Sequence, residues 1–227
     1  MLRSVALATG ILATAAPRAQ APAGTGTITG RVTLSHVRGT PLPSNVYAPR
    51  SVGNRQSTGT IPEIKNVLVY VKGATYRGTL PTSSQQILQE HESFAPRVLA
   101  ITRGSTVEFP NGDPFFHNVF SLSTAASFDL GRYPKGQTRG RQFTKAGLVK
   151  VYCQIHSHMS ASILVLDHPY FAIPAADGTY TIPNVPAGSY TLVGWHERVG
   201  ERSDRLEVES GQTAVLNFAL PVVEDRP

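Results

Sequence analysis

The residues best suited to chemistry lie between Cys153 and Met159, in the run Cys-Gln-Ile-His-Ser-His-Met. A thiol, an imidazole and a thioether therefore fall within one short segment. These soft and borderline ligands together favour copper over hard cations. Cys153 is also the only cysteine of the chain, so it has no partner for an internal disulfide. Its thiol is therefore either a metal ligand or a buried, inert group, and its neighbours favour the metal ligand.

A trigonal site of one Cys and two His with a weak axial Met is typical of electron-transfer copper. The segment lacks only a second imidazole, and His117 can supply it. His117 opens the run His-Asn-Val-Phe-Ser, directly after the loop Phe-Pro-Asn-Gly-Asp-Pro-Phe-Phe. The predicted ligands of one type 1 copper ion are therefore His117, Cys153, His156 and Met159.

Other chemistries fit these residues less well. Zinc can bind Cys and two His, but Met is a poor zinc ligand. A Cys–His nucleophile would need an oxyanion-hole motif, and the sequence shows none. Asp167, His168 and Glu197 form no recognisable acid/base pair, so we expect no enzyme. His158, inside the ligand segment, is either an exposed histidine beside the site or an alternative ligand or pH-dependent partner contact.

The elements that must position these ligands are expected to be strands, because apolar residues alternate in short runs bounded by Gly and Pro. Residues 83–91 fit either a short helix or an irregular strand, and residues 35–62, without periodicity, are expected to be an insertion. Hardly any helix is predicted, so the fold class is an all-β protein of sandwich type. The predicted strands cover residues 26–34, 66–72, 97–102, 105–111, 117–121, 147–153, 160–167, 177–185, 187–196, 204–210 and 213–220.

Three segments of the chain resemble the cupredoxins. They are Gly-Ser-Thr-Val-Glu-Phe-Pro-Asn at 104–111, His-Asn-Val at 117–119 and Gly-Leu-Val-Lys-Val-Tyr-Cys-Gln-Ile-His-Ser-His-Met at 147–159. The Cys-x-x-His-x-x-Met spacing is similar to that of the amicyanins, although His158 stands where they carry an apolar residue. The resemblance covers about residues 97–167. It implies a Greek-key β-sandwich, one type 1 copper with a Cu(II)/Cu(I) cycle, ligation by the four residues above, and an Asn118 that braces the ligand loop.

A second pair of motifs resembles the carboxypeptidase regulatory-like (transthyretin-like) β-sandwich. One is Gly-Thr-Ile-Thr-Gly-Arg-Val-Thr-Leu at 26–34, and the other is the hairpin run at 177–196. In that family the two parts are separated only by a valine-rich strand such as residues 66–72. The resemblance implies a discontinuous domain of residues 24–75 and 170–221, with a copper domain of residues 80–169 inserted in it. The alternative is that residues 26–75 add edge strands to the cupredoxin.

Residues 1–21 have the form of a cleavable signal peptide. Arg3 gives a positive start, residues 5–16 form an apolar run too short to cross a bilayer, and Ala-Gln-Ala at 19–21 fits a cleavage site. We therefore expect a periplasmic or extracellular protein. Cleavage removes Arg3 and Arg18 and lowers the net charge from +6 to +4.

The mildly basic charge indicates an acidic partner or an anionic membrane surface. Basic residues also dominate residues 115–165, where Asp129 is the only acidic residue. One hypothesis is one-electron transfer with an acidic protein partner, such as a c-type cytochrome or a dehydrogenase. The other is non-redox copper handling, or a structural or docking subunit of an extracytoplasmic or membrane-associated complex. Neither nucleic acid nor a small-molecule substrate is expected.

Overall fold

The computed structural model describes residues 24–38 and 63–224, and within them it confirms the all-β prediction. The only helical element there is a short 3-10 turn, η1 (Glu63–Asn66). The predicted signal peptide and residues 39–62 of the predicted insertion lie outside the described residues. The insertion was expected to begin at Ser35, but residues 35–38 continue the first strand. No helix of the described part is long and apolar enough to span a bilayer.

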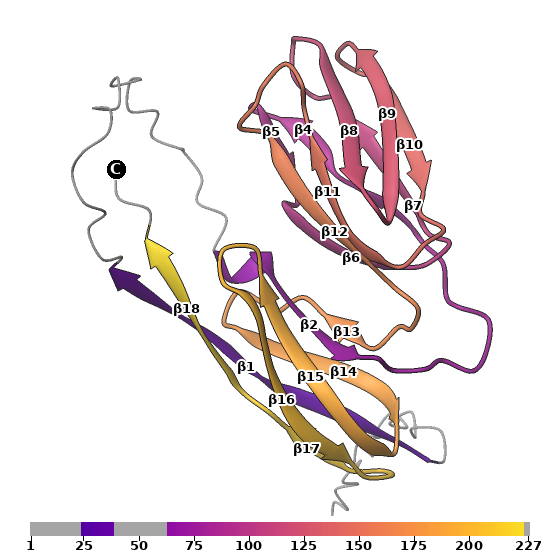
Figure 1. Ribbon diagram of the computed structural model, residues 1–227, viewed down its shortest axis with the longest axis vertical. Coiled ribbons are helices and arrows are strands. Elements are labelled where there is room, and N and C mark those ends of the chain that lie inside the picture. Colours follow the sequence, from indigo (N-terminus) through magenta and orange to yellow (C-terminus); the bar gives the residue numbers. More distant parts are fainter. Residues whose placement is uncertain (1–23, 39–62, 225–227) are drawn as a thin grey trace, which may run out of the picture.

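One β-sandwich is built from the middle of the chain (Figure 1). A five-stranded sheet has the order β6-β12-β11-β8-β9, a second sheet has the order β10-β7-β3, and β4 pairs with β5. Residues 83–91, for which helix and strand were both open, contain short strands. The bounds are β3 (Ser84–Gln86), β4 (Leu88–Glu90), β5 (Ser93–Ala95), β6 (Val98–Thr102), β7 (Thr106–Pro110), β8 (His117–Ser123), β9 (Ala126–Tyr133), β10 (Thr138–Gln142), β11 (Gly147–Tyr152) and β12 (Ser160–Leu166).

The core of this sandwich explains why the strands form where they do. Val107 and Phe109 alternate with half-exposed neighbours along β7, and both are fully buried. Burial of each such side chain contributes about 1.5–3 kcal/mol. β9 was not predicted although Ala126, Phe128 and Leu130 alternate with Ser127 and Asp129, and β10 was not predicted because it contains no apolar residue that could give a periodic signal. Both ends of the ligand segment, Cys153 and Met159, belong to the same buried cluster as Val107 and Phe109.

A second β-sandwich combines strands from both ends of the chain. β1 pairs with β14 on one side and with β17 and β18 on the other, while a second sheet has the order β13-β2-β15-β16. Their side chains share one buried cluster. Independent folding of the two parts, which the predicted domain boundaries imply, remains a prediction. The bounds are β1 (Thr25–Arg38), β2 (Val67–Lys72), β13 (Phe171–Ala172), β14 (Thr179–Pro186), β15 (Gly188–His196), β16 (Gly200–Val208), β17 (Thr213–Val215) and β18 (Phe218–Glu224).

The predicted strand over residues 213–220 is in fact two strands, β17 and β18, interrupted at Leu216 and Asn217. Gly30 of β1 faces this interruption so closely that a Cβ atom would lie 1.7 Å from the Leu216 carbonyl oxygen. Asn217 accepts the backbone N–H of Arg31 through its side chain, 2.8 Å away. The interruption therefore lets two short strands share one long partner.

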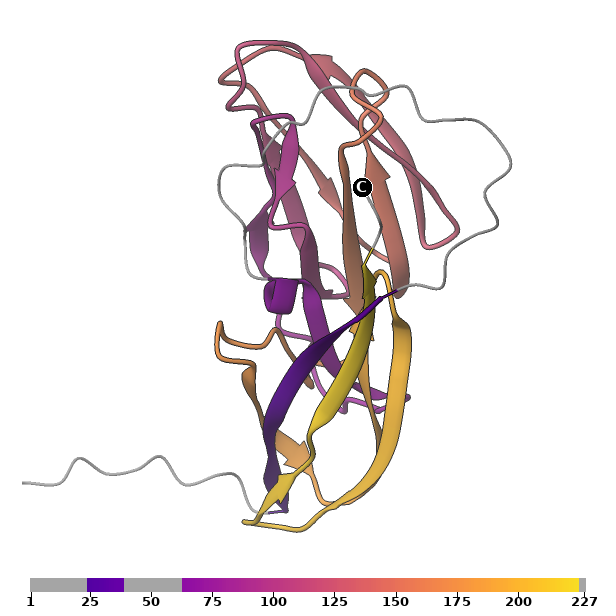
Figure 2. The ribbon, with the colours of Figure 1, turned by 90° about the vertical axis from the view of Figure 1, so that its left-hand side faces the viewer.

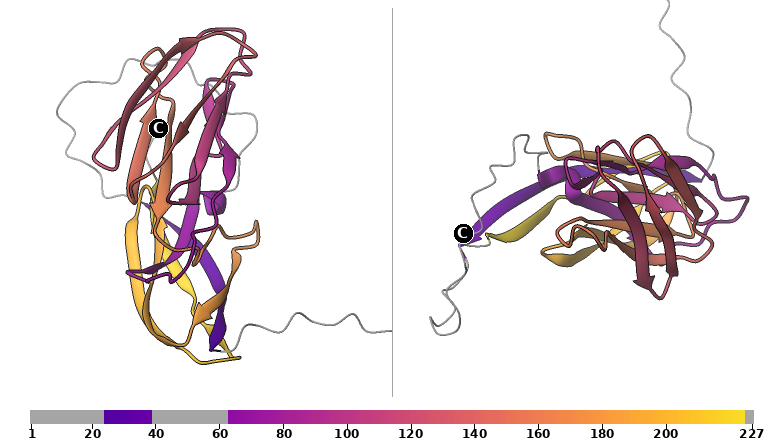
Figure 3. Two further views of the ribbon diagram at one scale, coloured as in Figure 1. Left: turned by 90° about the vertical axis from the view of Figure 1, so that its right-hand side faces the viewer. Right: turned by 90° about the horizontal axis from the view of Figure 1, so that it is seen from above.

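The two sandwiches follow one another along the long axis of the molecule and touch through the outer face of β6 and β12 (Figures 1, 2 and 3). Trp195 lies in this contact, with the Lys150 ammonium 5.5 Å from its ring centre. Glu197 forms ion pairs with Arg97 and with Lys150. The apolar part of the contact is formed by Leu68, Tyr70, Val98, Leu166, Val193 and Trp195.

A fragment that begins at residue 170 should fold poorly, because β14 and β15 would lose their partners β1 and β2. Unpaired strand edges and half a core rarely give a stable small domain. Joining residues 24–74 directly to residue 170 should restore cooperative unfolding, measured by circular dichroism. A fragment of residues 80–169 should fold and bind copper alone. Cooperative unfolding of the isolated C-terminal fragment would show that it folds without β1 and β2.

Candidate metal centre

Three of the predicted ligands converge where β8 begins and β11 ends, at the top of the upper sandwich in Figure 1. His117 is the first residue of β8, and Cys153 follows β11 directly. The two Nδ1 atoms of His117 and His156 lie 3.0 Å apart. The Cys153 Sγ atom lies 3.8 Å from the first nitrogen and 3.9 Å from the second.

This triangle of donor atoms has the size that a metal ion requires. The point equidistant from the three atoms lies about 2.1 Å from each. Metal–imidazole and metal–thiolate bonds are about 2.0–2.3 Å long. The His117 side chain is fully buried, the Cys153 residue is 3% exposed, and only His156 reaches the surface in part. The residues therefore fit a metal ion that is shielded from water.

Met159 closes the loop that carries these donors. Its backbone N–H donates to the His156 carbonyl at 3.0 Å, and its carbonyl accepts from the Cys153 N–H at 3.4 Å. Its side chain is 1% exposed and lies in the same buried cluster as Cys153. A thiolate, two imidazoles and a thioether form the donor set typical of type 1 copper. The individual ligand assignments remain predictions.

Asn118 ties the ligand loop to β8. Its side-chain oxygen accepts the backbone N–H of Gln154, the residue after Cys153, at 2.8 Å. Its amide nitrogen faces Asp129 on β9 at 3.4 Å. These contacts match the bracing role that the cupredoxin resemblance implies for Asn118.

Asp113 is a residue of the site that the sequence did not reveal. Its Oδ2 atom lies 2.8 Å from Nε2 of His117, and both side chains are buried. Burial alone would raise the pKa of Asp113, but the N–H groups of Glu92 and His91 and the His117 ring outweigh it and lower that pKa. A carboxylate on the far nitrogen of a metal-binding histidine fixes the tautomer and the orientation of the ring. The one available signal was an acidic residue in the loop before His117.

His158 is not one of the three converging donors. Its Nε2 atom lies 3.3 Å from a carboxylate oxygen of Glu92, and its side chain is 57% exposed. This geometry supports the interpretation of His158 as an exposed histidine beside the site.

Trp195, His196 and Glu197 are three consecutive residues at the end of β15 and directly after it. Trp195 and Glu197 belong to the contact between the sandwiches, as described above. His196 is buried, with Nε2 at 3.3 Å from Glu63 in a geometry too poor for a hydrogen bond, and burial lowers its pKa. Within the described residues, the only cluster of three or more His, Cys, Asp or Glu side chains that could hold a metal is the one at Cys153.

Exposed apolar side chains lie in the two chain segments that carry His117 and His156. Phe115, Phe116 and Ile155 are between 41% and 56% exposed. The Phe115 ring centre lies 6.0 Å from that of His156 and 6.1 Å from that of His117. The exposed Phe115 ring therefore borders both histidines of the site.

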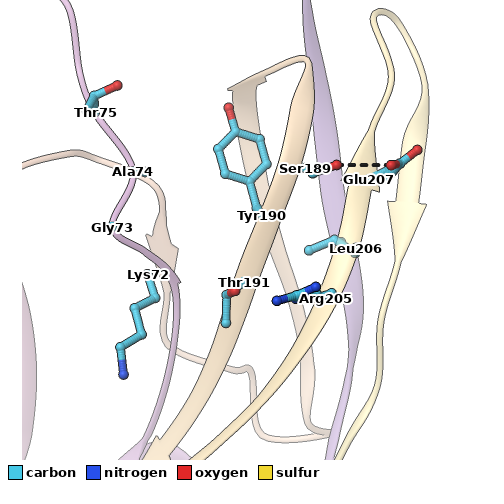
Figure 4. A pocket seen from close by; sticks show the side chains of 10 residues that line it. All are labelled: Lys72, Gly73, Ala74, Thr75, Ser189, Tyr190, Thr191, Arg205, Leu206 and Glu207. Carbon is cyan, nitrogen blue, oxygen red and sulfur yellow. Dashed lines mark hydrogen bonds between the residues drawn. The ribbon is translucent and has the colours of Figure 1, made fainter.

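A cleft of about 700 Å³ lies elsewhere, on the second sandwich between β16, β15 and the end of β2 (Figure 4). Of its charged residues, Lys72 is paired with Glu201 at 2.7 Å, and Glu207 accepts a hydrogen bond from Ser189 at 3.0 Å. None of the predicted copper ligands lines it. We assign the cleft no role in the chemistry of the site.

Comparison with known proteins gave one family match and several structural matches. Residues 154–216 match the family described as polysaccharide lyase family 4, domain II, a region that includes the ligand loop after Cys153, β12 and most of the C-terminal hairpins. No curated protein matches the chain.

The structural matches include a copper-containing nitrite reductase from Thermus scotoductus SA-01, with 30% identity over 41% of this chain and a TM-score of 0.34. This chain spans only 24% of the length of that reductase. The reduced P94F mutant of amicyanin matches with 22% identity over 37% of this chain and 82% of its own, at a TM-score of 0.34. A purple cupredoxin from Nitrosopumilus maritimus matches with 23% identity over 36% and 99%, at a TM-score of 0.33.

The assignment of the fold rests on the sheets and on the donor atoms described above. The middle of the chain forms a two-sheet sandwich with a His, a Cys-x-x-His and a Met at one end. The chain therefore contains a cupredoxin-like β-sandwich with the donor set of a type 1 copper site at one end, joined to a second β-sandwich that carries most of the polysaccharide lyase family 4 domain II match.

Proposed function

We propose that this protein is a periplasmic or extracellular electron carrier that exchanges single electrons with a protein partner through one type 1 copper ion. The observation that carries the proposal is the convergence of His117 Nδ1, His156 Nδ1 and Cys153 Sγ within 4.8 Å. Secretion is supported by the signal peptide predicted over residues 1–21.

When bound, copper supplies a one-electron redox couple between Cu(II) and Cu(I). The protein supplies a ligand set whose positions are already fixed by strands and a short hydrogen-bonded loop. A buried His117 and a buried Cys153 keep water from the donor atoms. His156 alone reaches the surface in part, so it offers the shortest route from the site to a bound partner.

Two features of the surface near the predicted copper ligands support a protein partner of a particular kind. The apolar group of Phe115, Phe116 and Ile155 favours a close, dry contact around His156. Arg132 of β9 lies opposite Asn118 of β8 in the sheet. Lys135 lies in the β9–β10 turn, where the backbone N–H of Gly136 donates a hydrogen bond to the Asn111 carbonyl. Both cations therefore lie beside the ligand end. An acidic redox protein, such as a c-type cytochrome or a dehydrogenase, fits this surface.

The second sandwich favours a second candidate function, that of a docking subunit in a surface or membrane-associated complex. It provides none of the predicted copper ligands, yet it is held firmly to the copper-site sandwich by the contact around Trp195. Reversible reduction of the purified protein would separate an electron carrier from a non-redox copper-handling protein.

Replacement of Cys153 by Ser should abolish the intense visible absorption of the copper-loaded protein. The absorption arises from charge transfer between the Cys153 thiolate and Cu(II), and a serine hydroxyl cannot supply it. His158→Gln is the matched control in the same loop and should keep the absorption. A copper-loaded wild-type protein without colour would refute the blue-copper assignment.

Met159→Leu should keep the colour and raise the reduction potential, because a weak axial donor preferentially stabilises Cu(II). For a one-electron couple, a tenfold change in relative affinity corresponds to about 59 mV, and a rise of that order is expected. Protein-film voltammetry would measure it. An unchanged potential would mean that Met159 is not bound, and His158 would then be tested in its place.

Arg132→Glu combined with Lys135→Glu should slow electron exchange with an acidic c-type cytochrome by about tenfold or more at low salt. Stopped-flow kinetics at increasing ionic strength should show that the difference from wild type shrinks, because salt screens exposed charges. Arg205→Glu, an exposed cation on the second sandwich, is the control. Equal rates for all three proteins would rule out charge steering at this surface.

A further inference from the structure

The turn between β4 and β5 has an unusual backbone. Its two central residues, His91 and Glu92, have positive φ angles of 53° and 52°. A two-residue hairpin turn of this kind normally carries Asn-Gly or a similar pair, because a positive φ is unfavourable for most other residues. Among the described residues, Asn184 is the only other non-glycine residue with a positive φ. Strained residues of this kind persist where their surroundings hold them, and they often lie at functional sites.

The buried carboxylate of Asp113 holds both strained residues. Its Oδ1 atom accepts the backbone N–H of His91 at 2.7 Å, and its Oδ2 atom accepts that of Glu92 at 2.9 Å. Asp113 is itself oriented by Asn111, whose side-chain oxygen accepts the Asp113 backbone N–H at 3.0 Å. Hydrogen bonds from backbone N–H groups to an ionised carboxylate are among the stronger ones in proteins.

The same carboxylate contacts the predicted copper ligand on β8. Asp113 Oδ2 lies 2.8 Å from Nε2 of His117, whose Nδ1 atom faces Cys153 and His156. A proton on Nε2, donated to Asp113, leaves the Nδ1 lone pair free for a metal. One carboxylate therefore connects the strained turn to the donor atom of His117.

The turn also contacts the ligand loop. A carboxylate oxygen of Glu92 lies 3.3 Å from Nε2 of His158, between His156 and Met159. In β4, just before the turn, the Gln89 carbonyl accepts a hydrogen bond from the backbone N–H of Gly112, the residue before Asp113. Residues 90–93 thus bridge the two segments that must meet at the copper ion, the loop before β8 and the loop after β11.

We infer that the turn at residues 90–93 is a clamp for the copper site, in which Asp113 is the positioning residue of His117. The inference rests on the copper site proposed above. Asp113 holds the strained turn closed, and the closed turn fixes Asp113 where it selects the tautomer and orientation of His117. The two effects are coupled, because the same two oxygen atoms make all three contacts.

The first test uses the full-length, copper-free protein and needs no electron transfer. Amide hydrogen exchange at His91 and Glu92 should become at least about tenfold faster in Asp113→Asn and faster still in Asp113→Ala, because accepting oxygen atoms are lost. Asp177→Asn is the matched control. Asp177 accepts the N–H and the hydroxyl of Thr179 in a turn of the second sandwich, so its loss should leave His91 and Glu92 unaffected.

The second test measures copper affinity and unfolding in a double-mutant cycle. Asp113→Asn should weaken copper binding about 10–100-fold, as is usual for an outer partner of a metal-binding histidine. His91→Gly with Glu92→Gly relaxes the turn, because glycine adopts a positive φ without strain. In that background Asp113→Asn should lower the Tm by less than it does in wild type.

Additive effects in the cycle, or unchanged exchange at both amides in Asp113→Asn, would overturn the clamp. Unchanged copper affinity in that variant would overturn the positioning of His117. If Asp113→Ala fails to fold, Asp113→Asn and the glycine turn still decide the question. A wild-type protein that binds no copper would refute the proposed function, whereas the exchange data on copper-free protein would still test the clamp on the turn.

Discussion

The approach of two imidazole nitrogens and one thiol sulfur to within 4 Å of one another is the constraint on which the rest of the site depends. Fixing the backbone of each residue in such an arrangement costs roughly 1–2 kcal/mol in conformational entropy. Burial of apolar side chains in the core of the β-sandwich offsets that cost. The same core contains Cys153 and Met159, the two ends of the ligand loop. His117 is fixed because it starts a central strand, and the loop after β11 is fixed because its first and last residues are hydrogen-bonded to each other.

Polar contacts around the ligands complete this arrangement. Asn118 of β8 accepts a hydrogen bond from the backbone N–H of Gln154, the residue after Cys153. Asp113 contacts Nε2 of His117, the ring nitrogen that faces away from Cys153. On the outer face of the same sheet, Lys150 of β11 lies between Ser162 of β12 and Trp195 of the second sandwich. The second sandwich therefore supports the two strands that carry the ligand loop, which links an apparently separate half of the molecule to the geometry of the site.

Features that depend on residue type and on the local periodicity of apolar residues could be predicted from the sequence. The sequence identified the donor set, and it located most strands with a clear alternation, such as β7 and β2. It did not locate β9, although apolar residues alternate along that strand, or β10, which contains no apolar residue. It also missed the break between β17 and β18, which depends on the close approach of Gly30. Asp113 was missed for a similar reason. Its role depends on a turn about 20 residues earlier in the chain, a contact that only the folded chain creates.

The most direct test of the account is a spectroelectrochemical titration of the copper-loaded wild-type protein. The account predicts that the visible band disappears on reduction and returns fully on oxidation, with one electron taken up for each bound copper ion. That result would connect the convergent donor atoms to reversible electron transfer. Copper that binds without colour, or a band that does not return after one reduction cycle, would contradict the account.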